Sequence, residues 1–334
     1  MNLESRIQAF AYLGDYLSHD FYIDQIDEIH AAELANPWFT QDNIKLSIKN
    51  WSQQLNIDVL KAWLNPYKLS EVNFTKNVLV IMAGNIPLVG FHDFLSVVVF
   101  GHKVIVKMSS NDNILLPLLI NKLFDINPEF KKYIEFIDDI QDKKFDGVIA
   151  TGSDNSAKYF EYYFKNTNTI IRRNRRSVAV LDGTESDLQL KGLSYDVFRY
   201  FGLGCRNVSK VFLPEGYDLN ILFEAFYHFK DLMNHQKYIN NYHYNKTVFL
   251  IGRNIIFENA FLILKEDKSL FSPISVLFYE YYNNISDVEQ YLKHKKDQLQ
   301  CIVSKDAVPF GETQNPNLWD YADGVDTIDF LKAL

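Results

Sequence analysis

The chain has few of the residues that mark the common special classes of protein. Its 334 residues include only two cysteines, Cys205 and Cys301, and no CxxC pair of the zinc-binding type. Two cysteines are too few for a secreted disulfide framework, so a reducing compartment is expected. There is no internal repeat and no low-complexity tract. No metal site is predicted.

Long apolar runs and a surplus of positive charge are also missing. The most apolar region, residues 77–99, is interrupted by polar residues, glycine and proline, and leaves no span of about 20 apolar residues. The first residues lack the basic region and apolar core of a signal peptide. The formal net charge of -8 argues against nucleic-acid binding, which depends on lysine and arginine. We therefore predict a soluble cytoplasmic protein without stable membrane insertion.

What the sequence does contain is an alternation of short apolar strands with helices. After a helical region at residues 1–67, strands are predicted at 77–83, 102–110 and 147–150, each followed by a helical pattern. Such alternation is typical of a parallel sheet covered on both faces. The predicted fold class is therefore α/β.

The chain is long enough for two lobes with separate cores. We expect N-terminal helices and a dinucleotide-binding lobe at residues 1–182, and a second α/β lobe at residues 183–310 that carries a nucleophilic cysteine. Residues 311–334 are polar and turn-rich before a short amphipathic end, which predicts a C-terminal strap.

Three polar break points follow predicted strands, where ligands bind on parallel sheets. They are Asn85, residues 107–110 and residues 151–153. Each also has a purely structural interpretation. Asn85 could cap the next helix, Lys107 could be an exposed charge at a strand end, and Ser153 could cap a helix after a turn. The usual glycine fingerprints of dinucleotide and phosphate binding are absent, so a cofactor would have to bind without them.

Cys205 lies in the segment GLGC, between a glycine-containing turn and an apolar run. Gly202 and Gly204 allow an open turn on which a thiol is accessible. The alternative is a small buried hydrophobic residue, the commonest role of a single cysteine in such a chain.

One dense basic segment, IIRRNRR at residues 170–176, has two interpretations. It could be a solvated strand edge, or a clamp for the phosphates of a cofactor or of CoA. His228 and His235 lie seven residues apart without a further ligand nearby, which favours structural roles.

Taken in order, these segments resemble the aldehyde dehydrogenase superfamily, specifically its acyl-CoA reductase branch, which includes the fatty-acyl reductases of bacterial bioluminescence. The matching segments are AGNIP at 83–87, GHKVIVKMSS at 101–110, ATGSDNSAKYF at 150–160, GLGC at 202–205 and LFSP at 270–273. They resemble the family's PWNFP, GNTVVLKPSE, FTGS, GQxC and IFGP segments. The resemblance implies an aldehyde-dehydrogenase-like fold with a parallel-sheet cofactor lobe and a catalytic lobe.

The resemblance also implies roles for individual residues. Cys205 would be the nucleophile and Asn85 the amide that holds the oxyanion. Lys107 and Ser109 would contact the adenosine ribose region of NADPH or NADH, and Gly152 and Ser153 its phosphates. No metal ligand is implied.

Two departures from the family pattern bear on the chemistry. Ile171 occupies the position of the glutamate that activates water in hydrolytic relatives, and Ser269 that of a glutamate that holds the nicotinamide ribose. Without a base for water, an acyl-cysteine intermediate should await a hydride. This favours reduction of an acyl-CoA, such as a fatty acyl-CoA, to the aldehyde.

Alternatives stay open. They are an ordinary aldehyde dehydrogenase with another base, a reductase of acyl phosphates, and an inactive relative that binds without catalysis. The resemblance also allows an acyl-donor protein partner and a homodimer.

Overall fold

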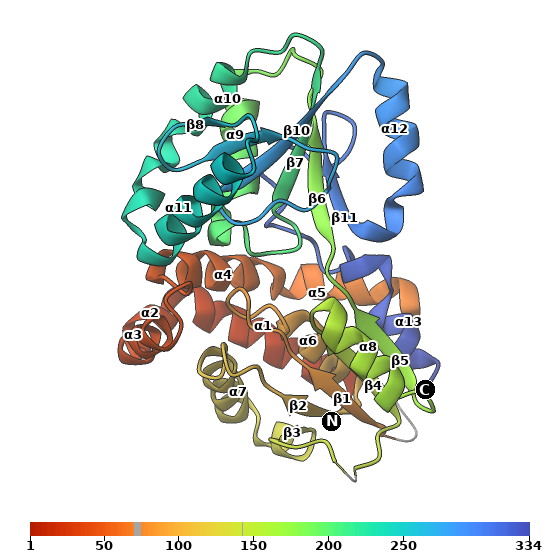
Figure 1. The fold of residues 1–334 in the computed structure, drawn as a ribbon. Helices are drawn as coiled ribbons and strands as arrows, with labels where there is room; N and C mark the ends of the chain where they lie inside the picture. The colour runs from red at the N-terminus through yellow and green to blue at the C-terminus, as the bar shows by residue number, and fades with distance from the viewer. Residues whose placement is uncertain (70–74, 142) are drawn as a thin grey trace. The chain divides into compact units, whose positions relative to one another are not determined.

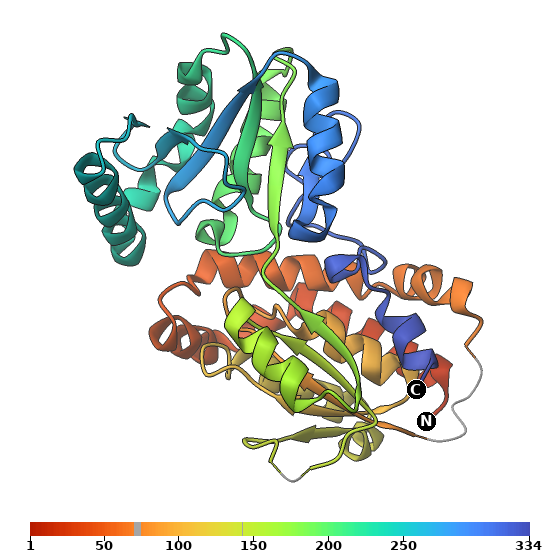
Figure 2. The same cartoon turned by 45° about the vertical axis from the view of Figure 1, so that its right-hand side comes forward.

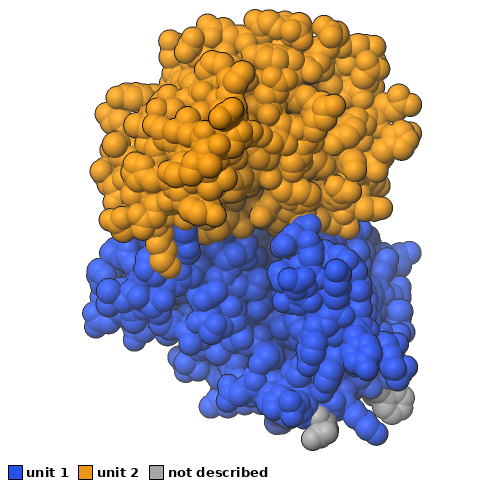
Figure 3. Space-filling model, viewed as in Figure 1, with its two compact units in different colours: residues 1–174, 317–334 blue, residues 175–316 orange. Residues whose placement is uncertain are grey.

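The computed structural model describes residues 1–69, 75–141 and 143–334, and the chain forms two compact units. Unit 1 contains residues 1–174 and 317–334, and unit 2 contains residues 175–316 (Figure 3). The C-terminal residues from 317 onward thus fold with the N-terminal unit. Residues 175–182, which the sequence analysis assigned to the first lobe, fold with unit 2.

Unit 1 is built on a five-stranded sheet with the strand order β3-β2-β1-β4-β5, in which all pairs are parallel (Figure 1). The prediction of a parallel sheet is confirmed. Its strands are β1 (Asn77–Ile81), β2 (Lys103–Lys107), β3 (Ile134–Phe136), β4 (Gly147–Thr151) and β5 (Asn168–Arg172).

Both faces of this sheet are covered, which explains why its strands are apolar throughout. Val78 and Val80 of β1 pack into the large core made with the N-terminal helices, whereas Leu79 and Ile81 pack into a smaller core with Phe164. Successive side chains of a strand point to opposite faces, so one apolar strand serves both cores.

The helices of unit 1 pack chiefly as amphipathic elements against the larger core, and α13 returns to contact α6. They are α1 (Leu3–His19), α2 (Phe21–Asp24), α3 (Ile26–Ala35), α4 (Gln41–Gln54), α5 (Ile57–Leu64), α6 (Phe91–Phe100), α7 (Leu115–Ile126), α8 (Asp154–Tyr163) and α13 (Thr327–Lys332).

Unit 2 contains a six-stranded sheet with the order β11-β6-β7-β10-β9-β8, parallel except for the β8–β9 pair. Its strands are β6 (Arg176–Val180), β7 (Val208–Pro214), β8 (Phe257–Glu258), β9 (Ile263–Glu266), β10 (Val276–Tyr282) and β11 (Leu299–Val303). Because β6 pairs with β7 and β11, it is a central strand of unit 2.

Four α-helices accompany this sheet among the described residues of unit 2: α9 (Asp187–Phe198), α10 (Leu219–Phe226), α11 (Gln236–Ile251) and α12 (Ile285–His294). α12 lies beside the β6 and β11 end of the sheet and α11 beside the β8 end (Figures 1 and 2). α9 contacts both α10 and β7. In the part of the chain that the structure describes, no helix is long and apolar enough to cross a membrane.

Candidate active site

The carboxyl edge of the sheet in unit 1 carries the residues that the sequence analysis assigned to the cofactor and the oxyanion. β2, β1 and β4 are adjacent and parallel, so the loops that follow them leave the sheet at the same edge. Asn85 lies in the loop after β1, Ser109 in the loop after β2, and Gly152 in the loop after β4. The topology thus gathers three segments that are far apart in the sequence.

Asn85 is exposed at this edge, in a loop that packs closely on its neighbour. A Cβ atom on Gly84 would lie only 2.6 Å from Ser109 Oγ, so the close approach of the two loops requires glycine at this position. The following helix α6 begins after Gly90 without a side-chain capping bond. The helix-cap alternative for Asn85 is therefore wrong.

The same loop contains a strained residue, Leu88, whose φ angle is 58°. Its backbone N–H donates a hydrogen bond of 2.8 Å to Oδ2 of Asp112, which lies just beyond Ser109. Burial raises the pKa of Asp112 to about 6, above its ordinary value of 3.8. A buried carboxyl thus holds the loop that carries Asn85.

Lys107 ends β2 with its side chain half-buried. Its Nζ donates a 2.6 Å hydrogen bond to the backbone carbonyl of Asp138. Ser109 Oγ accepts a hydrogen bond from the backbone N–H of Asn111 at 3.2 Å. These bonds fix both side chains at the edge where the sequence analysis expected them to meet a ribose.

Gly152 and Ser153 form a tight strand-to-helix connection. Ser153 caps α8 by accepting a hydrogen bond from Ser156 N at 3.3 Å. A Cβ on Gly152 would lie 2.8 Å from Ser156 Cβ, so glycine allows α8 to begin directly against the strand end. The turn-and-cap interpretation is thus correct, and the N-terminus of α8 still presents backbone N–H groups suited to an anion.

For Arg172 the interpretation as part of a clamp for phosphates is wrong. It is only 4% exposed, and its guanidinium donates hydrogen bonds of 3.1 and 2.7 Å to the carboxylate of Asp93. Further bonds reach Ala322 O at 2.6 Å and Thr327 Oγ1 at 2.9 Å. Arg172 ties α6 to the C-terminal residues of unit 1, so it does not face a ligand. Arg173 instead forms an exposed ion pair with Glu161.

Cys205 lies in unit 2, in the turn between α9 and β7, and its side chain is half-buried. The turn contains three successive residues with positive φ angles: Tyr200 at 52°, Phe201 at 57° and Gly202 at 75°. Such angles are favourable for glycine but strained for bulky side chains. Gly202 thus uses the positive φ that glycine allows, and two strained residues precede it.

The second thiol lies in the same hydrogen-bond network but in a different environment. Ser177 Oγ donates to the carbonyl of Cys205 at 3.1 Å and lies 3.0 Å from Cys301 Sγ. Arg206 Nη1 lies 3.9 Å from that sulfur. Cys301 is buried, and burial raises the pKa of its thiol despite the nearby guanidinium. A neutral, enclosed thiol is a poor nucleophile, and Cys301 is the more buried of the two cysteines.

The positions where relatives carry glutamates hold no carboxylate here. Ile171 lies in β5, and Ser269 lies in a loop where its Oγ accepts a bond from Phe271 N at 3.2 Å. One buried carboxylate lies close to the cysteine turn: Asp196 accepts bonds from Gly311 N at 2.7 Å and from Thr313 N at 3.0 Å. Both carboxylate oxygens of Asp196 therefore accept hydrogen bonds from the backbone of residues 311–313.

Sequence reasoning missed Asp196, Ser177 and Asn207 as parts of this network. Asn207 follows Cys205 by two residues, and a polar amide so close to a nucleophile was the available signal. Asp196 and Ser177 are not adjacent to Cys205 in the sequence, and no local pattern marked them as parts of the network.

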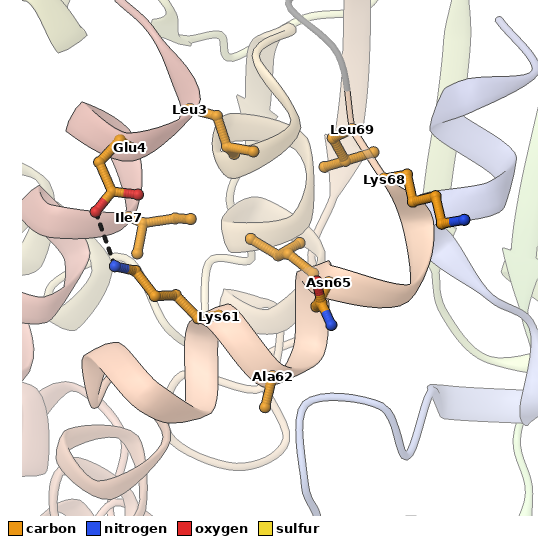
Figure 4. Close-up of a pocket in the computed structure, with 9 residues that line it drawn as sticks. Leu3, Glu4, Ile7, Lys61, Ala62, Asn65, Lys68 and Leu69 are labelled. Carbon is orange, nitrogen blue, oxygen red and sulfur yellow. Dashed lines mark ion pairs between the residues drawn. The ribbon is translucent and has the colours of Figure 1, made fainter.

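Neither His228 and His235 nor a cavity in unit 1 adds to this site. His235 caps α11 and His228 Nε2 lies 3.1 Å from Ser194 Oγ, as expected of structural residues. Over the described ranges no three His, Cys, Asp or Glu side chains gather as a metal site would require. A cavity of about 550 Å³ in unit 1 lies between α1 and α5, where Glu4 pairs with Lys61 at 2.9 Å (Figure 4). It includes none of the candidate site residues.

The chain has two units, each with a largely parallel sheet. This is the fold of the aldehyde dehydrogenases. Solved structures support this. Aldehyde dehydrogenase 21 from Physcomitrella patens, in complex with succinate, matches with a TM-score of 0.63 and 11% identity over 92% of this chain and 74% of that one. Betaine aldehyde dehydrogenase from Staphylococcus aureus, in complex with NAD⁺, matches with a TM-score of 0.61 and 12% identity over 92% and 71%.

The particular family follows from the sequence. The family model described as acyl-CoA reductase (LuxC) matches residues 26–312, so the chain belongs to the LuxC acyl-CoA reductase family. No match was found among curated protein sequences. The protein is an oxidoreductase whose fold and family support nicotinamide-dependent chemistry at the aldehyde group.

Proposed function

We propose that this protein reduces an acyl-CoA, of which a fatty acyl-CoA is the preferred candidate, to the aldehyde with NADPH or NADH. The reaction would pass through an acyl-cysteine on Cys205. The observation that carries the proposal is the contrast between the chain's two thiols: Cys205 is half-buried on a strained turn, and Cys301 is enclosed with a raised thiol pKa. Only Cys205 is accessible enough to meet a bulky thioester.

The first step is transfer of the acyl group. The Cys205 thiolate attacks the thioester carbonyl, a tetrahedral oxyanion forms, and CoA leaves as its thiolate when the carbonyl is restored. By its place in AGNIP, which resembles the family's PWNFP, Asn85 is the amide that would donate a hydrogen bond to the oxyanion, and loss of such a contact commonly costs ~10² to 10³ in rate.

The carboxyl edge of unit 1 has a donor set that fits a nicotinamide dinucleotide. The N-terminus of α8 with Gly152 and Ser153 suits the phosphates, and the fixed side chains of Lys107 and Ser109 suit ribose hydroxyls. When bound, the reduced nicotinamide supplies the hydride that takes the acyl group to the aldehyde level. Cys205 then departs as thiolate when the aldehyde is released.

The same residues explain why reduction should prevail over hydrolysis. At position 171 β5 carries isoleucine, which cannot remove a proton from water. The nearby Asp196 is fully buried and accepts bonds from Gly311 and Thr313, so it is not available as that base. An acyl-cysteine should therefore persist until a hydride is delivered.

The test is acyl-CoA-dependent oxidation of NADPH or NADH, followed at 340 nm. We expect turnover in the wild type, loss of turnover in Cys205→Ala, and retention within a few-fold in the matched control Cys301→Ser. If Cys205→Ala kept the wild-type rate, the proposed nucleophile would be wrong.

Assays with two other substrates, a model ester and an acylated carrier protein, test the hydrolytic and the protein-donor alternatives. Rapid multiple turnover of a model ester would indicate hydrolysis by water, as in an ordinary aldehyde dehydrogenase. Turnover with an acylated carrier protein, but not with free acyl-CoA, would indicate a protein partner as acyl donor. Absence of turnover with any donor would favour an inactive relative that only binds.

A further inference from the structure

We infer that Asn207 is a positioning residue that holds the Cys205 turn in its reactive conformation. The inference rests on the proposed role of Cys205 as nucleophile. Asn207 is 2% exposed and lies two residues after Cys205, directly before β7. A buried primary amide needs partners for its oxygen and for both of its hydrogens.

The partners of Asn207 lie on both sides of the turn. Its Oδ1 accepts a 2.8 Å hydrogen bond from the backbone N–H of Gly204, the residue directly before Cys205. Its Nδ2 donates to the backbone carbonyls of Asp196 at 3.0 Å and Arg199 at 2.9 Å. One side chain therefore connects the residue before the nucleophile to the end of α9.

The end of α9 requires such a partner for a general reason. The last carbonyls of an α-helix have no intrahelical donor, and burial makes an unpaired carbonyl costly. Here the chain turns sharply after α9 through the positive φ angles of Tyr200 and Phe201. The Asn207 amide satisfies carbonyls at this helix end, including that of Arg199 immediately before the strained pair.

The strained pair would relax without such support. Positive φ angles are strained at bulky residues and persist only where the surroundings impose them. The Phe201 ring lies 4.3 Å from the His235 ring, centroid to centroid, which fixes one side of the turn. Asn207 holds the residue directly before the thiol, and Ser177 holds the carbonyl of Cys205.

Removal of the amide should therefore displace the thiol without changing any group that reacts. A displacement of about 1 Å can cost about 10²-fold in rate. We expect Asn207→Ala and Asn207→Asp to lower kcat about 10- to 100-fold and to leave the KM for NADPH close to the wild-type value. The pH dependence of Cys205 alkylation by iodoacetamide, measured by peptide mass mapping, should shift in both variants.

Asn245→Ala is the matched control. Asn245 is also a buried amide of unit 2, 7% exposed, and its Nδ2 donates to the Ile274 carbonyl at 3.0 Å. Its loss should lower the thermal midpoint but leave kcat and the alkylation profile of Cys205 unchanged. Equal effects of Asn207→Ala and Asn245→Ala on kcat and alkylation would reduce Asn207 to a stabilising residue and overturn the inference.

The readouts separate this inference from the proposed function. If Cys205→Ala retained turnover, the nucleophile would be misassigned, whereas the alkylation profile would still report whether Asn207 orders the turn. If neither Asn207 variant folded, hydrogen exchange of the wild type would decide. The Gly204 amide should exchange as slowly as the amides of β7, and exchange at the rate of an exposed loop would overturn the inference.

Discussion

Arg172→Ala distinguishes a structural arginine from a phosphate clamp. The substitution leaves the Asp93 carboxylate without its guanidinium partner in a site where Asp93 is only 7% exposed. Removal of one member of a buried ion pair costs about 3–5 kcal/mol, because the remaining charge stays desolvated. The bonds to Ala322 and Thr327 are lost at the same time, so we expect a value at the upper end of this range.

That loss is a large part of the about 5–15 kcal/mol that keeps a typical domain folded. The assay is denaturant unfolding of the wild type and the variant, combined with the KM for NADPH at low temperature, where the variant remains folded. Arg173→Ala is the matched control, because its ion pair with Glu161 is exposed and should contribute at most about 1 kcal/mol. Wild-type stability together with a raised KM in Arg172→Ala would refute the structural role and restore the clamp.

Three further outcomes are expected. Burial raises the pKa of Asp112 to about 6, so its contribution to the free energy of unfolding is complete below about pH 4 and is lost as the pH rises through 6. The free energy of unfolding should fall by at most about 1.4 kcal/mol per pH unit in this range. In Asp112→Asn the free energy of unfolding should depend less on pH over the same range. Iodoacetamide at pH 7.5 should label Cys205 before Cys301, and equal labelling rates would argue against Cys205 as the reactive thiol. Gly84→Ala should place a methyl group against Ser109 and lower both stability and turnover; unchanged values would show that the two loops do not need their close contact.

The sequence alone predicted the sheet of unit 1 well because its signals are local. Apolar strands such as residues 77–81 are buried on both faces, and glycine or polar residues follow within a few positions of their carboxyl ends, as at Gly84, Ser109 and Gly152. The turn that precedes Cys205 was also visible from its glycines. These features depend on neighbouring residues, which a sequence displays directly.

The errors involve partners that are distant in the sequence. Arg172 looked like part of an exposed basic patch, but Asp93 lies 79 residues away and nothing local marks the pair. The capping role weighed for Asn85 is also wrong, because α6 begins without a side-chain cap. Burial is decided by packing of whole elements, so an isolated charge pattern could not reveal it.

The boundary between the two units, which falls directly after β5, was also not predictable from local sequence. β6 (Arg176–Val180) follows β5 without a long linker, so its pairing with β7 and β11 in the second sheet was not visible locally.

The central claim is that Cys205 carries the acyl group, and the most direct measurement is mass spectrometry of the protein mixed with an acyl-CoA in the absence of nicotinamide. We predict a mass increase equal to one acyl group, located on the Cys205 peptide and removed when NADPH is added with release of the aldehyde. An unmodified Cys205, or an acyl group found on Cys301 instead, would contradict the account.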